Sequence, residues 1–274
     1  MSELLAGWPV PHAALAVLST EGVLSTEGEL DRQFWLASLT KPLAGLAALV
    51  AVEEGALELD EPVPGLPPEL ASATLRHLLA HAGGLAPDRR ERAAAVGTRR
   101  IYSNAGFDLI GEAVAAATGM PFAQYLTESV LAPLGCSSAR LSGSPARDAV
   151  ASARDWIPLL QLLLAGGGRI LDPSTLADAT SVQWPGLPGV LPGYGSQPDN
   201  CWGLAFEIRG SKQPHWTAPG NSAATYGHFG QGGSMFWVDP AAGLAVVALA
   251  DEPFGDWARQ AWPALSAQVL HRFG

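Results

Sequence analysis

The stretch around Ser38 constrains the fold and the chemistry of this chain more than any other part of the sequence. The residues from Trp35 to Pro42 run directly into an apolar segment from Leu43 to Val52. Pro42 lacks a backbone N–H and is tolerated only in the first turn of a helix, so we expect a helix to begin at or just after Ser38. Residues three apart share a helix face, which puts the Lys41 amine beside the Ser38 hydroxyl. A hydroxyl beside an amine is a nucleophile beside a candidate base.

The use of lysine elsewhere in the chain supports this interpretation. Of the 16 basic residues, 14 are arginine, and the only lysines are Lys41 and Lys212. A guanidinium group cannot act as a base, so a lysine at position 41 is informative in a chain that otherwise uses arginine. The alternative interpretation is that Ser38 caps a helix N-terminus and Lys41 is solvated.

Composition and charge indicate a globular protein and disfavour two classes of partner. The chain has 274 residues, 48% of them hydrophobic and 15% charged, enough for one domain or two subdomains. The net charge of −10 disfavours nucleic acid and anionic membranes as partners. The arginines between positions 89 and 100 are interrupted by Glu91 and preceded by Asp88, so we expect a solvated loop face there.

The chain carries no motif for secretion, membrane insertion or metal binding. No basic residue precedes Arg32, the apolar run from Ala13 to Leu18 is too short for a signal peptide, and no run reaches the length of a membrane span. We therefore expect a cytoplasmic protein. Cys136 and Cys201 lack paired spacing and are expected to be free buried thiols, and the six histidines show no metal-binding spacing. We expect no metal and no cofactor.

Hydrophobic periodicity predicts strands at both ends of the chain and helices between them. Strands are expected at 13–19 and 23–27, and again at 202–209, 225–229, 234–238 and 244–250, before a final helix at 256–272. Helices are expected at 74–81, 105–117, 121–131, 153–165 and 173–179. The resulting fold class is α+β: an antiparallel sheet from both termini flanked by the Ser38 and C-terminal helices, with an inserted helical subdomain.

Two further stretches bring polar groups that suit the same chemistry. Residues 101–104 offer Tyr102 and Asn104 from a loop before a helix, and residues 226–233 carry His228 and a glycine-rich turn. In this order, Ser-x-x-Lys, Tyr-x-Asn and His-x-Gly resemble the serine beta-lactamase and penicillin-binding-protein superfamily. The resemblance is greatest to its class C-like branch, which contains esterases, D-aminopeptidases and DD-peptidases.

This resemblance extends over most of the chain. Residues 78–85 look like the Leu-Leu-x-His-x-Ser-Gly-Leu segment of the branch, with Ala80 and Gly83 in place of the usual Thr and Ser. Residues 132–135 look like its Pro-Leu-Gly turn, and residues 228–240 like its closing strand pair. The resemblance implies one catalytic domain of beta-lactamase/transpeptidase-like fold over residues 1–274. Residues 1–55 and 200–274 would form the sheet subdomain, and residues 56–199 the helical one.

The resemblance also implies three catalytic roles, which agree with the chemistry of the residues. Ser38 is expected to attack an acyl carbonyl and form an acyl-enzyme, and Lys41 to take its proton. That requires a lysine whose pKa is lowered by burial and neighbouring dipoles. Tyr102 is expected to share proton transfer with Lys41 and later to activate water. The alternative for Tyr102 is a core tyrosine that precedes a helix.

The remaining site residues are expected to bind substrate. Asn104 would hydrogen bond Lys41 or the substrate, cap the following helix, or do both. The resemblance implies an oxyanion hole formed by the backbone N–H groups of Ser38 and Gln231, with Gly230 allowing close backbone approach. At position 228 beta-lactamases and transpeptidases usually carry Lys, and His228 is instead expected to be mostly neutral at pH 7.

These residues predict a serine hydrolase that forms an acyl-enzyme on Ser38. The loss of a fixed positive charge at position 228 favours a carboxylesterase on small neutral esters. The alternatives are a beta-lactamase or D-amino-acid peptidase on the same site, and a non-catalytic relative that uses the cleft for binding. Expected partners are small ester, amide or lactam substrates. We expect His81 to be structural. The sequence does not predict the oligomeric state.

Overall fold

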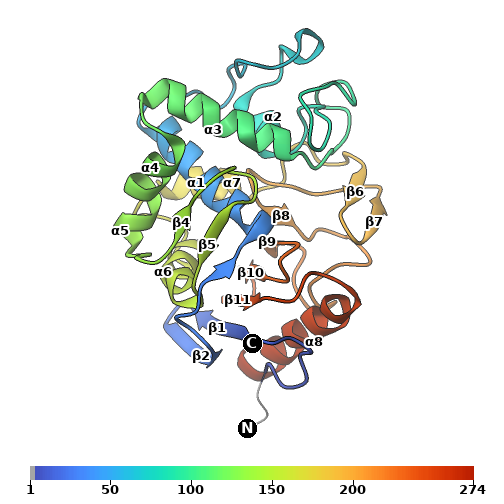
Figure 1. Ribbon diagram of the computed structural model, residues 1–274. Coiled ribbons are helices and arrows are strands. Elements are labelled where there is room, and N and C mark those ends of the chain that lie inside the picture. Colours follow the sequence, from blue (N-terminus) through green and yellow to red (C-terminus); the bar gives the residue numbers. More distant parts are fainter. Residues whose placement is uncertain (1–3) are drawn as a thin grey trace.

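Strands from the two ends of the chain form one antiparallel sheet in the order β2-β1-β11-β10-β9-β8. The computed structural model describes residues 4–274, and helices lie on both sides of this sheet (Figure 1). The fold class is α+β, as predicted. The strands are β1 (Ala13–Ser19), β2 (Gly22–Gly28), β3 (Phe34–Trp35), β4 (Arg140–Leu141), β5 (Ala149–Ala151), β6 (Gly189–Leu191), β7 (Gly195–Gln197), β8 (Glu207–Ile208), β9 (Tyr226–Phe229), β10 (Met235–Asp239) and β11 (Leu244–Ala250).

The helices connect and cover these strands. The α-helices are α1 (Thr40–Glu53), α2 (Leu75–Leu79), α3 (Asn104–Thr118), α4 (Phe122–Leu126), α5 (Ala132–Leu134), α6 (Ala153–Leu164), α7 (Pro173–Ala179) and α8 (Asp256–Phe273). Short turns of other helix types are η1 (Ala37–Leu39), η2 (Pro68–Leu70) and η3 (Thr127–Leu131). Within residues 4–274, every helix is too short or too polar to cross a membrane.

Alternation along the central strands gives the sheet two buried apolar faces. On β1, Ala14 and Ala16 belong to the core that includes α1 and α6, whereas Leu15 and Val17 pack in the core that contains Trp262 of α8. We expected α1 and the C-terminal helix to cover the sheet. The structure adds α6, which contacts β1 and β11 although it lies in the segment expected to form the helical subdomain.

Ser38 lies in η1, immediately before α1, and it does not cap either helix. The residues at the N-cap positions are Leu36 for η1 and Leu39 for α1, and neither helix has a side-chain cap. Ala37 adopts a left-handed φ of 46°, which is strained for a residue with a side chain. A strained backbone held by its surroundings in this way is common where a reactive side chain must be presented. The capping alternative for Ser38 is therefore wrong.

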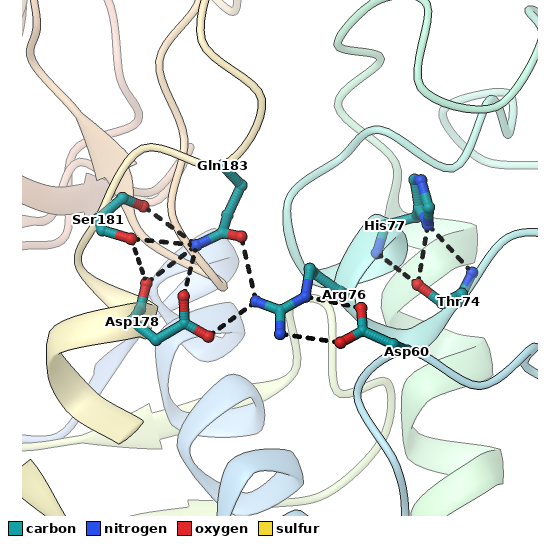
Figure 2. Close-up of polar contacts among 7 residues, drawn as sticks. All are labelled: Asp60, Thr74, Arg76, His77, Asp178, Ser181 and Gln183. Atoms are coloured by element: carbon teal, nitrogen blue, oxygen red, sulfur yellow. Dashed lines mark hydrogen bonds and ion pairs between the residues drawn. The ribbon is translucent and has the colours of Figure 1, made fainter. Parts of the chain in front are cut away.

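A polar network around Arg76 joins α2 to the Asp60 loop, to α7 and to Gln183 (Figure 2). Arg76 of α2 donates to both carboxylate oxygens of Asp60, at 2.8 and 3.1 Å, and to Asp178 of α7 at 2.7 Å. The same guanidinium donates to the Gln183 side chain at 3.2 Å. The two-point contact with Asp60 fixes the guanidinium geometry, so α2, α7 and the Asp60 loop hold one another in register.

Short strands account for most differences between prediction and structure. The strand expected at 202–209 is reduced to β8, and the strands β3 to β7 were not predicted. Each of these unpredicted strands has only two or three residues, which is too few to show a period of two. Their pairing depends on neighbours brought together by the fold.

Candidate active site

Ser38 and Lys41 come together as the helical spacing predicts. Lys41 Nζ lies 3.3 Å from Ser38 Oγ and donates to Asn104 Oδ1 at 2.7 Å and to the Ala146 carbonyl oxygen at 2.9 Å. These contacts come from α1, α3 and the loop before β5. They hold the amine at one point, beside the serine hydroxyl.

The environment of Lys41 favours its neutral form. The side chain is fully buried, and this burial lowers the pKa of the Lys41 amine from its ordinary value to about 7. The positive charge of Arg147 lowers this pKa further, whereas Asp108 and Asp88 oppose the shift. Near neutral pH a large share of the amine is therefore unprotonated and able to accept a proton.

Tyr102 lies against both Lys41 and His228. Lys41 Nζ is 4.5 Å from the centre of the Tyr102 ring, and the Tyr102 hydroxyl is 3.4 Å from His228 Nε2. Burial raises the pKa of the Tyr102 phenol well above its ordinary value, and a hydrogen bond with Ser38 opposes that rise. Because the phenolate is disfavoured, Tyr102 is better suited to donate or relay a proton than to remove one.

His81 supports the Tyr102 loop from behind. Its Nδ1 accepts a hydrogen bond from the Ser103 N–H at 3.2 Å, and its ring packs 4.6 Å from the Tyr102 ring, centre to centre. Burial lowers the pKa of His81 well below its ordinary value, so the ring is neutral. This placement agrees with the structural role expected for His81.

Asn104 connects Lys41 to the rim of the pocket. Its Oδ1 accepts from Lys41, and its Nδ2 donates to Asp88 Oδ1 at 2.7 Å. The helix cap is made by Ser103, whose hydroxyl accepts from the Gly106 N–H at 3.1 Å. The expectation that Asn104 itself caps α3 is therefore wrong, because its side chain turns toward Lys41.

Gly230 lets the β9–β10 turn approach the Ser38 backbone. A Cβ at position 230 would lie 2.4 Å from the Leu36 carbonyl oxygen and 3.2 Å from the Ser38 nitrogen. Within residues 4–274, the backbone N–H groups of Ser38 and Gln231 donate to no protein acceptor. Gln231 also lines the pocket that contains Ser38. Two unused N–H donors near a hydroxyl nucleophile are suited to bind a developing oxyanion.

Five of the predicted site residues line a pocket of about 240 Å³, whereas Lys41 and Gly230 lie outside its wall. Ser38, Tyr102, Asn104, His228 and Gln231 were predicted site residues that contribute to its wall. The wall also contains residues that the sequence analysis did not assign to the site: Pro87, Asp88, Leu191, Pro192, Trp202, Glu207 and Phe229. Neither lysine nor arginine is among the described residues that line it.

The described residues offer no metal site. Within residues 4–274, no group of three or more histidine, cysteine, aspartate or glutamate side chains is placed to hold a metal ion. Cys136 and Cys201 are free and buried, as predicted.

Comparison with known proteins gives the family. The beta-lactamase family model matches residues 10–271, so this chain belongs to the beta-lactamase family. The crystal structure of a beta-lactamase from Mycobacterium bovis is 50% identical, covers 98% of both chains and superposes with a TM-score of 0.94. The predicted superfamily is thereby confirmed.

Curated relatives cover smaller parts of the chain. The D-alanyl-D-alanine-carboxypeptidase/endopeptidase AmpH of Escherichia coli is 29% identical over 149 residues, 43% of this chain and 39% of its own length. Esterase EstB of Burkholderia gladioli is 32% identical over 162 residues, 44% of this chain and 41% of its own length. The matches thus span about two fifths of these relatives. At the level of the family, these similarities support a serine hydrolase or, with the Monacolin J acid methylbutanoyltransferase of Aspergillus terreus, an acyltransferase.

Proposed function

We propose that this protein is a carboxylesterase that cleaves small neutral esters through an acyl-enzyme on Ser38. The observation that carries this proposal is the contact between the Ser38 hydroxyl and the fully buried Lys41 amine, whose pKa lies near 7. A buried neutral amine can accept the serine proton at neutral pH, which an exposed lysine could not do.

Acylation follows from these positions. Ser38 Oγ attacks the ester carbonyl carbon while its proton passes to Lys41 Nζ. The N–H groups of Ser38 and Gln231 then stabilise the oxyanion, and the leaving alcohol takes a proton from Lys41, relayed by the Tyr102 hydroxyl. In deacylation a water molecule attacks the acyl carbon, and Lys41 and Tyr102 transfer its proton back to Ser38 Oγ. Asn104 keeps the Lys41 amine in place through both steps.

The pocket favours neutral substrates over carboxylate-bearing ones. Burial and the nearby Lys41 charge lower the pKa of His228 to about 3, so the ring carries no charge at neutral pH. With no lysine or arginine among the described lining residues, a substrate carboxylate would lack a cationic partner there. A neutral ester needs none.

A beta-lactamase or D-amino-acid peptidase activity on the same residues is the second candidate. It is favoured by the M. bovis structure, which is called a beta-lactamase and is 50% identical, and by the carboxypeptidase/endopeptidase AmpH. Use of the cleft for binding alone is the third, and the buried Lys41 argues against it, because a binding cleft has no need of an amine with a lowered pKa. We also propose a cytoplasmic location.

The experiment that tests this proposal compares neutral esters with a lactam that carries a carboxylate. We expect hydrolysis of p-nitrophenyl acetate and butyrate by the wild-type protein, loss of that activity in Ser38→Ala, and little turnover of nitrocefin, whose carboxylate has no partner. Turnover of nitrocefin with a higher kcat/KM than either ester would overturn the preference for neutral substrates. Equal ester hydrolysis by wild type and Ser38→Ala would overturn the role of Ser38.

A further inference from the structure

A second pocket shares a wall with the catalytic one. It has a volume of about 580 Å³ and lies among the β6–β7 loop, the segment 209–219 and α8. Glu207 lines the catalytic pocket, and two of its hydrogen-bond donors, the Lys212 amine and the His215 ring, line the second pocket. The buried ion pair between Glu207 and Lys212 therefore lies between the two pockets.

The lining of this second pocket is positively charged in a strongly acidic protein. Three cationic side chains line it, Arg209, Lys212 and Arg259, and the described lining residues include no aspartate or glutamate. Glu207 neutralises Lys212 within the wall. Arg259 pairs with Asp256 at 3.0 Å, but that pair is exposed and screened by water. The two guanidinium groups leave a net positive field in a chain whose net charge is −10.

Two buried polar groups in this lining have no partner within residues 4–274. They are the Tyr194 hydroxyl and Arg209 Nε, in side chains that are each about 8% exposed. The only hydrogen bond of the Arg209 side chain among the described residues is from Nη1 to the Gly210 carbonyl oxygen, at 3.3 Å. Burial raises the pKa of the Tyr194 phenol, and the positive charge of Arg259, which also lines the pocket, opposes this rise. Unpartnered buried donors are rare in folded proteins.

We propose that this pocket binds a small organic carboxylate. Two guanidinium groups and a phenol are donors suited to carboxylate oxygens, and the planar guanidinium can bind two oxygens at once. The volume exceeds what a lone inorganic anion fills, and Pro214, Pro219 and Pro263 provide an apolar surface for an organic body. The Tyr194 hydroxyl and Arg209 Nε are closed off from solvent, so a ligand reaches them only as these side chains turn toward it.

Calorimetric titration of the Ser38→Ala protein with benzoate tests this proposal. Benzamide, which has the same ring without the charge, and inorganic phosphate, which has the charge without the ring, are titrated in parallel. We expect saturable binding of one benzoate per chain and at least about tenfold weaker binding of the other two probes. If benzamide binds as tightly as benzoate, the pocket does not select for negative charge and the proposal is wrong. If phosphate binds as tightly as benzoate, the pocket does not select for an organic ligand, and the proposal is wrong as well.

Variants locate the bound probe. Arg259→Gln and Tyr194→Phe are each expected to weaken benzoate binding about tenfold, while Arg99→Gln, an exposed arginine elsewhere, leaves it unchanged. Tyr194→Phe removes an unpartnered hydroxyl, so its Tm should equal or exceed that of the parent protein. If Arg259→Gln and Tyr194→Phe both bind benzoate with the affinity of the parent protein, benzoate does not bind in this pocket and the proposal is wrong. The titration measures binding of benzoate and not ester hydrolysis, so the loss of activity expected in Ser38→Ala does not affect the result.

Discussion

The Tyr102 hydroxyl lies 3.4 Å from His228 Nε2, and His228 Nδ1 lies 2.7 Å from the Phe229 carbonyl oxygen. Because a carbonyl oxygen can only accept, Nδ1 carries the ring proton and Nε2 is left to accept from the phenol. A neutral imidazole thus occupies the position where beta-lactamases and transpeptidases usually carry a lysine.

Replacing His228 by lysine is therefore expected to change the substrate preference. In His228→Lys, a substrate carboxylate gains a charged partner, so the ratio of nitrocefin to p-nitrophenyl butyrate kcat/KM should rise by about tenfold or more. His228→Gln is the matched control, since it alters the ring without adding charge, and its ratio should stay near wild type. An unchanged ratio in His228→Lys, with the fold retained, would contradict our account of this position.

The pH profile of ester hydrolysis should follow the Lys41 amine. Because the pKa of Lys41 is lowered to about 7 and its neutral form is the base, kcat/KM should be low in acid and rise as pH passes through about 7. Arg147 contributes to this lowering, so Arg147→Gln should move the rise to higher pH. The control Arg99→Gln should leave it in place, and a wild-type profile in Arg147→Gln would count against the electrostatic explanation.

Lys41→Arg is expected to abolish turnover. Guanidinium does not give up its proton in proteins, so loss of the base should lower kcat by about 10³-fold. Arginine is larger than the fully buried lysine, so Lys41→Met serves as a second variant of similar size without charge. Both should lose activity, and Lys41→Met should keep the wild-type Tm within a few degrees. Substantial turnover in either folded variant would refute the role of Lys41 as base.

Gly230→Ala should disrupt the oxyanion hole. The added Cβ would lie 2.4 Å from the Leu36 carbonyl oxygen, which forces the turn or the Ser38 segment to move. Loss of one oxyanion donor lowers kcat by about 10²- to 10³-fold, with a smaller change in KM. Gly220→Ala is the control because its Cβ would meet only Leu270 Cδ1 at 3.5 Å, an ordinary contact. If both variants have wild-type kcat, the close approach of Gly230 has no catalytic importance.

Glu207→Gln should destabilise the fold. It would leave the buried Lys212 charge without its carboxylate, which costs about 3–5 kcal/mol of unfolding free energy. Glu112→Gln, which breaks an exposed pair with Arg90, should cost less than about 1 kcal/mol. Denaturant unfolding of the two variants measures this difference. Equal losses would show that the Glu207 pair is as weak as a surface pair.

The Glu207 carboxylate should also make the stability of the fold sensitive to acid. Burial alone would raise the pKa of Glu207, but the Lys212 and His215 partners outweigh burial, and the pKa of the folded state is lowered. A lowered pKa means that this stabilisation is complete above the unfolded value near 4.5 and is lost as pH falls below it. The Tm of the wild type should therefore fall more steeply below pH 4.5 than that of Glu207→Gln.

The part of the site formed by residues close together in the sequence was predicted from helix geometry. Ser38 and Lys41 lie three residues apart at a helix start, and that spacing alone puts the hydroxyl near the amine. The order of the later motifs indicated that Tyr102, Asn104 and His228 belong with them, and the structure brings all five residues together. The bounds of β1, β11 and α7 agree with the predicted ranges 13–19, 244–250 and 173–179.

The rest of the site depends on contacts that only the fold creates. The Ala146 carbonyl that holds Lys41 is a backbone group, and nothing in its side chain indicates the contact. Arg100 was expected on a solvated loop face, yet it is buried and donates to the Ala80 and Asn200 carbonyl oxygens at 2.8 and 3.1 Å. The charged residues near Arg100 in the sequence suggested a surface loop. The contact with Asn200, which is distant in the sequence, could not be predicted from them.

Covalent labelling of Ser38 tests the central claim most directly. Intact mass is measured for wild type and Ser38→Ala after exposure to a fluorophosphonate and, separately, to benzylpenicillin. We predict one fluorophosphonate adduct on the wild type, none on Ser38→Ala, and no accumulation of a penicillin adduct. Absence of any adduct on the wild type, or equal labelling of both proteins, would contradict the assignment of Ser38 as an activated nucleophile.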